Sequence, residues 1–126
     1  MNRVSMCLVA VVALVWLAAP ASGEVMHYSR CKLEAGKSVA DVQAWVNAWR
    51  KLKAAEKIDY QLRILQPHAD NDLGADEFFL EGRSSTLASH AAAWTWWYSD
   101  EDAAKSAAQL NAAASCDSGA VYRSTD

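Results

Sequence analysis

The sequence predicts an α+β fold: one antiparallel sheet of four strands with two helices on one face. Two segments repeat apolar residues every three to four positions, as amphipathic helices do. Four shorter segments are rich in β-forming residues and are bounded by turn residues, which is typical of strands. Cys31 and Cys116 lie near the two ends of the predicted domain, so a sheet that joins these ends also lets the two cysteines bond.

Residues 1–23 are typical of a secretory signal peptide. Arg3 supplies a charged start, residues 6–19 form an unbroken apolar run, and residues 20–23 are the small residues and proline that precede a cleavage site. The apolar run is shorter than the roughly 20 residues that a membrane-spanning helix needs. The sequence therefore predicts a cleaved leader and an exported protein, located in the periplasm or secreted.

Cleavage fits after Gly23 or after Ala21, and we favour Gly23. It removes Cys7 and leaves residues 24–126, which is enough chain for a single domain. That domain has 11 basic and 15 acidic side chains and no basic cluster with interleaved aromatic residues, so nucleic-acid binding is not expected. It contains no second apolar stretch of spanning length, so we expect no membrane span in the mature chain.

In the first half of the domain, the sequence predicts a strand followed by a long helix. Residues 25–33 mix β-forming and polar residues, and residues 34–37 form a turn. Ser38 and Asp41 have the spacing of a capping box, and the helix follows over residues 39–57. Its apolar stripe consists of Val39, Val42, Val46 and Trp49, with Trp45 and Leu52 beside it.

The middle of the domain predicts a hairpin. Residues 59–66 alternate apolar side chains with polar ones, and Pro67 ends the run. Residues 68–76 are rich in Asp, Asn and Gly and form a loop, and residues 77–83 form the next strand.

The last part predicts an interrupted helix and a short strand. Residues 84–86 offer helix caps, and the helix continues through Tyr98. A second cap-plus-acid pattern near Ser99 restarts the helix over residues 100–114. Residues 117–119 then form a turn, and residues 120–124 form the last strand.

The resulting order, β-α-β-β-α-β, is that of ferredoxin-like folds. The first and last strands are antiparallel neighbours in that topology, which places Cys31 close to Cys116. Two cysteines in an exported chain most simply form one disulfide, and this one closes most of the domain. Chain entropy predicts a stabilisation of about 4 to 5 kcal/mol. The alternative is a pair of free thiols that act as a nucleophile or as metal ligands.

By element order and length, the chain resembles the dimeric α+β barrel superfamily, which includes antibiotic-biosynthesis-monooxygenase-like and stress-responsive domains. The resemblance covers the whole mature chain, and it includes an aromatic second helix (His90, Trp94, Trp97) after the hairpin. It implies a dimer in which two sheets meet face to face and, in some members, a small ligand between sheet and helices. It also implies a cofactor-independent monooxygenase-like activity as one function.

Five tryptophans remain after cleavage, and all five lie on the predicted helices. One interpretation is that Trp45, Trp49, Trp94 and Trp97 pack the helices onto the sheet. The other is an aromatic-walled pocket for a flat or apolar ligand near Trp94 and Trp97. Trp96 lies off the main stripe of its helix, which suits a pocket rim or a partner contact.

His27 on the first strand and His90 on the second helix both face the predicted interior, and they could converge there. A histidine in such a place is usually structural, and shared chemistry is the alternative. No carboxylate is predicted beside either ring, and we assign no metal site and no cofactor. We name His27, His90, Trp94, Trp97 and Trp49 as candidate ligand-binding residues and name no catalytic residue.

Strand 77–83 carries apolar residues on both faces, with Phe78 and Leu80 on one side and Phe79 on the other. Because helices cover only one face, we expect a second copy to cover the other, which predicts a homodimer. Three functions remain open: a dimeric domain that binds a small apolar ligand, a cofactor-independent oxygenase, and an envelope interaction module that uses Trp96 and the acidic residues 100–102.

Overall fold

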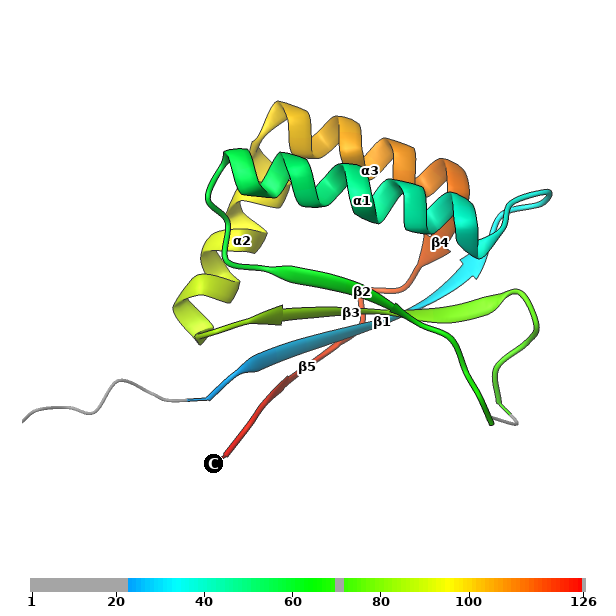
Figure 1. The fold of residues 1–126 in the computed structure, drawn as a ribbon. Helices are drawn as coiled ribbons and strands as arrows, with labels where there is room; N and C mark the ends of the chain where they lie inside the picture. The colour runs from blue at the N-terminus through cyan, green and yellow to red at the C-terminus, as the bar shows by residue number, and fades with distance from the viewer. Residues whose placement is uncertain (1–22, 70–71, 126) are drawn as a thin grey trace, which may run out of the picture.

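The computed structural model describes residues 23–69 and 72–125. The predicted signal peptide therefore lies outside the described residues, apart from Gly23. The elements in chain order are β1 (Val25–Leu33), α1 (Val39–Ala55), β2 (Gln61–Leu65), β3 (Glu77–Ser84), α2 (Leu87–Ser99), α3 (Glu101–Ala113), β4 (Ala114–Cys116) and β5 (Ala120–Arg123). They form one antiparallel sheet with the helices on one face, which confirms the α+β class (Figure 1).

The sheet is built around β1, which pairs with β3 along one side and with both β4 and β5 along the other. β2 lies at the far edge next to β3. The predicted single last strand is therefore two short strands, and the sheet has five strands instead of four.

A bend over residues 117–119 divides β4 from β5. Gly119 has a φ of 72°, a left-handed conformation that favours glycine. The Asp117 side chain holds the bend, because its Oδ1 accepts hydrogen bonds from the backbone N–H groups of Arg30 and Gly119, both at 3.0 Å. The sequence predicted the turn at 117–119, but it assigned Ala114 to the helix. Ala114 has extended backbone angles and begins β4.

The helix boundaries follow the predicted caps. Ser38 and Asp41 form the capping box of α1, and the Thr86 side chain accepts a hydrogen bond from the backbone N–H of Ser89 at the start of α2. Asp100 caps α3 and ends α2 at the same time, because its extended backbone breaks the helical run. The predicted interruption near Ser99 is thus confirmed, and the described residues contain three helices.

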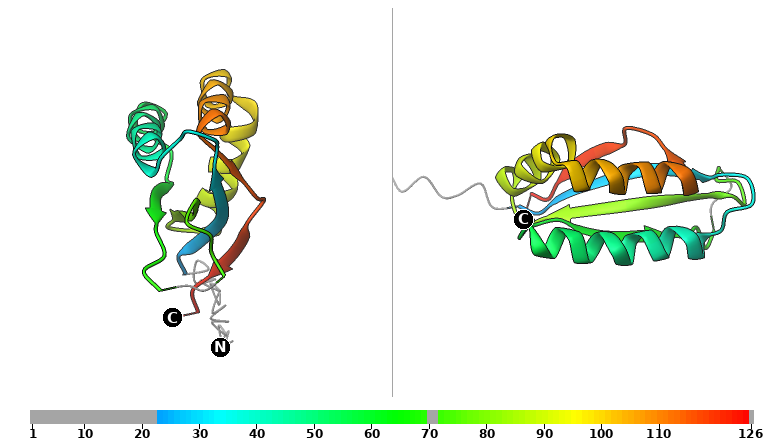
Figure 2. Two further views of the ribbon diagram at one scale, coloured as in Figure 1. Left: turned by 90° about the vertical axis from the view of Figure 1, so that its right-hand side faces the viewer. Right: turned by 90° about the horizontal axis from the view of Figure 1, so that it is seen from above.

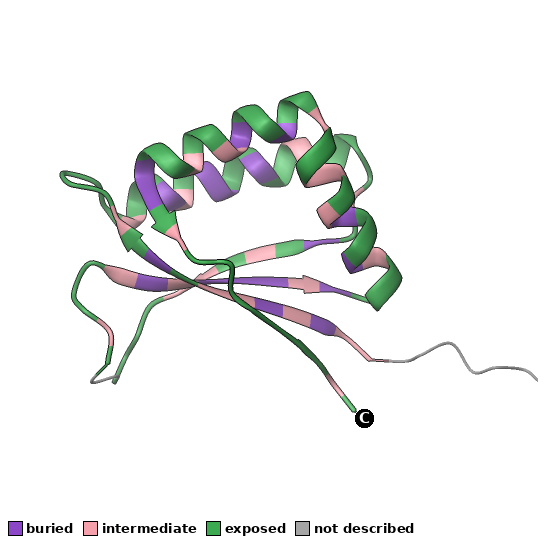
Figure 3. Cartoon of the chain, turned by 180° about the vertical axis from the view of Figure 1, so that it is seen from behind, coloured by how far each residue is buried: buried purple, intermediate pink, exposed green. Residues whose placement is uncertain are grey.

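Helices α1 and α3 lie side by side above the sheet, and α2 descends to the sheet at one end (Figures 1 and 2). Buried side chains line the helix surfaces that face the sheet, while the outer surfaces are exposed (Figure 3). The Trp45 indole N–H donates to the backbone oxygen of Ser106 at 2.8 Å, which ties α1 to α3 inside this layer. No helix in the described part of the chain is both long enough and apolar enough to cross a membrane.

Strand β1 is linked to the C-terminal part of the chain near both of its ends. Cys31 and Cys116 face each other across β1 and β4 and form a disulfide, with a Cα–Cα distance of 4.0 Å. At the other end of β1, the Ser124 backbone N–H donates to the Glu24 backbone oxygen at 3.0 Å. The predicted proximity of the first and last strands is therefore confirmed.

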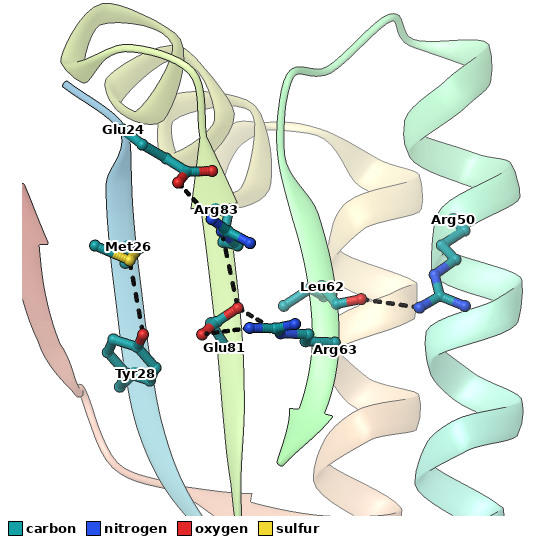
Figure 4. Close-up of polar contacts among 8 residues, drawn as sticks. All are labelled: Glu24, Met26, Tyr28, Arg50, Leu62, Arg63, Glu81 and Arg83. Atoms are coloured by element: carbon teal, nitrogen blue, oxygen red, sulfur yellow. Dashed lines mark hydrogen bonds and ion pairs between the residues drawn. The ribbon is translucent and has the colours of Figure 1, made fainter. Parts of the chain in front are cut away.

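The sheet face without helices carries a chain of ion pairs across three strands (Figure 4). Glu81 on β3 is only 2% exposed and accepts two hydrogen bonds from Arg63 on β2, at 2.6 and 3.2 Å. Arg83 lies 3.9 Å from the same carboxylate and also pairs with Glu24. Burial raises the pKa of Glu81, but the hydrogen bonds from Arg63 and Tyr28 and the guanidinium charges outweigh it, so the net pKa is lowered.

Candidate functional site

A cavity of about 420 Å³ lies between the helices and the sheet. Its size is within the range of pockets that hold small organic ligands. Its walls come from helices α1, α2 and α3 and from strands β1, β2, β3 and β4. The connection between β4 and β5 also contributes. Among its lining residues, Tyr98, Asn111, Asp117 and Ser118 are exposed, and they mark its opening to solvent.

Aromatic side chains make up most of the cavity wall on the helix side. The lining includes Trp45, Trp49, Trp94, Trp96 and Trp97, all five tryptophans of the predicted mature domain. Trp97 meets Trp45 edge-on at 6.4 Å between ring centroids, and Trp49 meets Tyr60 at 5.9 Å. Pairs of this geometry hold the rings in fixed positions, so the walls are flat, rigid surfaces suited to a flat ligand.

His27 is the polar centre of the sheet-side wall. It is 5% exposed, and its ring lies 4.8 Å from the Trp94 ring. Its Nε2 is 2.9 Å from the Ser118 backbone oxygen, and its Nδ1 is 3.4 Å from the Tyr60 hydroxyl. A carbonyl oxygen can only accept a hydrogen bond, so Nε2 carries the proton and Nδ1 of the neutral ring is the acceptor.

Two glycines create the space that this arrangement needs. Gly82 pairs with His27 across the sheet, and a Cβ at Gly82 would lie 1.8 Å from the Tyr60 hydroxyl oxygen. A Cβ at Gly119 would lie 2.4 Å from His27 Nε2. Glycine is therefore required at both positions by close approach, so that the Tyr60 and His27 rings can occupy their observed places.

His90 lies behind this wall. Its ring is 6.1 Å from His27 and 5.9 Å from Tyr60, and it is 8% exposed. Burial, with a smaller contribution from His27, lowers the pKa of His90. Its Nδ1 is buried without a hydrogen-bond partner among the described residues. A neutral imidazole is the form that this environment favours.

Tyr60 contacts both histidines and the cavity. It is mostly buried, and burial raises its pKa, while the nearby Trp94 indole acts in the opposite direction. The phenol is therefore neutral over the physiological pH range and can donate its proton to His27 Nδ1 in a hydrogen bond.

The structure brings the five predicted ligand-binding residues into one region, and four of them line the cavity directly: His27, Trp49, Trp94 and Trp97. His90 packs against His27 and Trp94 but does not line the cavity. Trp96, predicted at a rim or partner contact, lines the cavity and is half-buried.

Sequence reasoning missed Tyr60, Ser118 and Gly82. Tyr60 looked like one more apolar residue of an alternating strand, whereas it precedes β2 and turns its hydroxyl toward His27. Ser118 acts through its backbone oxygen, which no side-chain pattern reports. A glycine in a strand interior is a signal for close approach of another group, and Gly82 carried that signal.

No group of three or more His, Cys, Asp or Glu side chains suited to a metal ion occurs within residues 23–69 and 72–125. The predicted alternative of free thiols does not apply, since Cys31 and Cys116 are bonded to each other.

No family model matches the sequence, and no curated protein matches it. Among solved structures, the fold is similar to that of SnoaB, a cofactor-independent oxygenase from Streptomyces nogalater. The TM-score is 0.57 and the sequences are 11% identical, with 83% of this chain and 96% of that chain covered. At this identity the likeness concerns the fold, and it supports a ferredoxin-like α+β architecture.

Proposed function

We propose that this protein is an exported domain that binds a small, flat, largely apolar ligand in the tryptophan-lined cavity. The observation that carries the proposal is the cavity itself: about 420 Å³ of space between the helices and the sheet of a small domain. Rigid aromatic walls and a few polar groups at one side are the usual composition of a ligand site. The disulfide is compatible with the export that the leader sequence predicts.

The test is a calorimetric titration with 2-methoxynaphthalene, a flat apolar probe, followed by the shift in melting temperature. We expect saturable binding with a Kd in about the micromolar range and a rise in melting temperature, because a ligand that binds only the folded state stabilises it. The absence of binding by this probe and by similar bicyclic aromatics would contradict the proposal.

Two neighbouring alanines on α3 provide a matched pair of variants. Ala107 lines the cavity, while Ala108 is exposed on the same helix. Ala107→Phe should fill part of the cavity and weaken binding by about tenfold or more, and Ala108→Phe should leave the affinity unchanged. Equal effects of the two variants would place the ligand elsewhere.

A second candidate function is cofactor-independent oxygenation. Two observations favour it: the structural neighbour SnoaB is such an enzyme, and His27 places an imidazole acceptor in the cavity wall. In such a reaction the substrate itself must supply the electrons to oxygen after it loses a proton. Oxygen consumption with a panel of naphthols, above that of heat-denatured protein, tests this function. The Ala107→Phe variant should abolish the excess consumption.

We also propose that two copies pair through the sheet face that lacks helices. Phe79 and Tyr28 lie on this face, and the charges of Arg63 and Arg83 are neutralised there by Glu81 and Glu24. A sheet face with apolar side chains and internally paired charges suits a symmetric contact between identical sheets. Light scattering should give twice the mass of one chain, and Phe79→Lys should give a monomer. A strictly monomeric wild-type protein at micromolar concentration would contradict the dimer.

A further inference from the structure

Three groups from separate parts of the sequence are connected by consecutive hydrogen bonds at the cavity wall. The Ser118 backbone oxygen, in the bend between β4 and β5, accepts from His27 Nε2 at 2.9 Å. His27 Nδ1 in turn faces the Tyr60 hydroxyl at 3.4 Å. His27, Tyr60 and Ser118 all line the cavity. The order is therefore a fixed acceptor, an imidazole and a hydroxyl.

The order of these three groups determines the direction in which a proton can move. The carbonyl fixes the protonated nitrogen of His27, which leaves the lone pair of Nδ1 aimed at the Tyr60 hydroxyl. An imidazole that is oriented on one side and faces a hydroxyl on the other can take the hydroxyl proton, as in known acid–base pairs. The 3.4 Å separation suits a site that tightens when a ligand is bound.

The Tyr60 oxygen retains capacity to accept a hydrogen bond. A tyrosine hydroxyl donates one hydrogen bond and has two acceptor lone pairs. The donated bond goes to His27, so a ligand that contacts this oxygen most favourably offers a proton to it. Because burial keeps the phenol neutral, the oxygen does not carry a charge that would repel an electron-rich ring.

We propose that Tyr60 and His27 form a proton-accepting pair for a bound hydroxyarene, a flat aromatic ring that carries an acidic hydroxyl group. This proposal rests on the proposed ligand-binding function and names the chemical class of the ligand. In the step, the O–H bond of the ligand breaks and its proton moves to the Tyr60 oxygen. The original Tyr60 proton moves to His27 Nδ1, which leaves an aryloxide anion, a neutral phenol and an imidazolium ion.

The surroundings of His27 allow this charge to form. The Ser118 oxygen continues to accept from Nε2 of the imidazolium, and the Asp117 carboxylate lies on the adjacent residue. His90 is a titratable group in ring contact with His27, and burial lowers its pKa, which favours its uncharged form next to an imidazolium. The aryloxide and the imidazolium attract each other inside a site that is partly screened from water.

The experiment compares two probes that differ by one proton donor, 4-nitrophenol and its methyl ether 4-nitroanisole. The titrations are run below the pKa of free 4-nitrophenol, so that nitrophenolate absorbance above that of the free probe at the same pH reports ionisation on the protein. We expect both probes to bind, 4-nitrophenol about tenfold more tightly, and the phenolate band to grow with the bound fraction.

Tyr60→Phe removes only the hydroxyl and should equalise the two affinities and abolish the phenolate band. Tyr122→Phe is the matched control, because Tyr122 on β5 is 56% exposed, contacts Tyr28 instead of His27 and does not line the cavity. It should keep both the preference and the band. Melting temperatures and circular dichroism of both variants confirm that they fold, and His27→Gln provides a second variant that should also lose the band.

The outcomes separate the two proposals. If neither probe binds, the ligand-binding function itself fails. If both bind with equal affinity and no phenolate forms, the cavity binds aromatic ligands and the proton-accepting pair is wrong. If the preference and the band survive in Tyr60→Phe and in His27→Gln, another group accepts the proton, and the assignment to these residues is overturned.

Discussion

The two faces of the sheet differ in how their buried polar groups are hydrogen-bonded. On the face without helices, Glu81 receives two hydrogen bonds from Arg63, and Arg83 and Tyr28 lie close to the same carboxylate. Beneath the helices, His90 Nδ1 and Trp96 Nε1 have no partner among the described residues, and Trp96 lines the cavity. The Tyr60 oxygen, also in the cavity wall, can accept a further hydrogen bond. On the first face the buried carboxylate has its partners, although Arg83 Nε is buried without a hydrogen bond among the described residues. On the second face, buried polar atoms without partners adjoin the cavity.

This difference is the basis for placing the proposed ligand site beneath the helices. A carboxylate that is already paired with guanidinium groups contributes to folding and has little capacity left for another molecule. Unsatisfied polar groups beside empty space cost stability, so their presence in a native protein calls for an explanation, and a ligand supplies one. Substitutions on the two faces test this difference.

The largest effect is expected from the disulfide, which crosses the sheet beside the cavity. Cys31→Ala combined with Cys116→Ala should lower the free energy of unfolding by about 4 to 5 kcal/mol, because the bridge closes a loop with a sequence separation of 85. Urea denaturation of both proteins measures the change. Cys116 also lines the cavity, so the affinity for 2-methoxynaphthalene should fall in the same variant. A loss below about 1 kcal/mol would show that the chain-entropy account does not apply.

Gly82→Ala acts on the covered face alone. The new Cβ would lie 1.8 Å from the Tyr60 oxygen, and displacing the ring should cost about 1 to 3 kcal/mol of stability. A double-mutant cycle with Tyr60→Ala isolates the cause, since the added methyl group should cost much less once the ring is absent. If the cost is the same in both backgrounds, the clash with Tyr60 is not its source.

Glu81→Gln breaks the ion-pair network on the face without helices. We expect a loss of about 1 to 2 kcal/mol at neutral pH, a modest value because Arg63 is largely exposed and screened by water. The lowered pKa of Glu81 means that its stabilisation is fully present above its usual pKa of 4.5 and is lost as the pH falls through the lower folded value. Thermal melts between neutral and acidic pH should converge for wild type and variant. Ligand affinity should not change.

The smallest effect is expected at His90. Its pKa is lowered in the folded state, so below the usual value of 6.5 the unfolded chain binds more protons than the folded one and stability falls. His90→Phe should remove this dependence and change stability at neutral pH by less than about 1 kcal/mol. Unfolding measured on both sides of pH 6.5 tests it. A variant as sensitive to pH as the wild type in this window would assign the effect to another group.

The sequence predicted most of the fold, because local signals and the global topology agree. The cap at Asp100 marked the break between α2 and α3. The element order predicted that the first and last strands are neighbours, and the positions of Cys31 and Cys116 agreed with it. It did not predict the split of the last strand. That split depends on how Asp117 binds the backbone of Arg30, a contact between residues far apart in the chain.

The sequence also predicted part of the site, namely the residues that a local pattern marks. Tryptophans on helix stripes indicated an aromatic interior, and alternation on β1 placed His27 inside. The partners of His27 could not be inferred, since one is a backbone oxygen of Ser118 and the other is Tyr60, whose ring reaches it only because Gly82 has no side chain. Such contacts depend on tertiary packing and leave no periodic pattern.

The hydrogen bonds between Glu24 and Ser124 place the start of β1 and the end of β5 side by side, at 3.0 and 3.1 Å. This makes the domain a natural subject for circular permutation, with a short linker across these ends and new termini in the exposed loop between β2 and β3. In the permuted chain the Cys31–Cys116 bridge would close only a short loop through the new joint. The same covalent bond would then constrain the unfolded chain far less, so comparing the two connectivities separates its entropic contribution from its local packing.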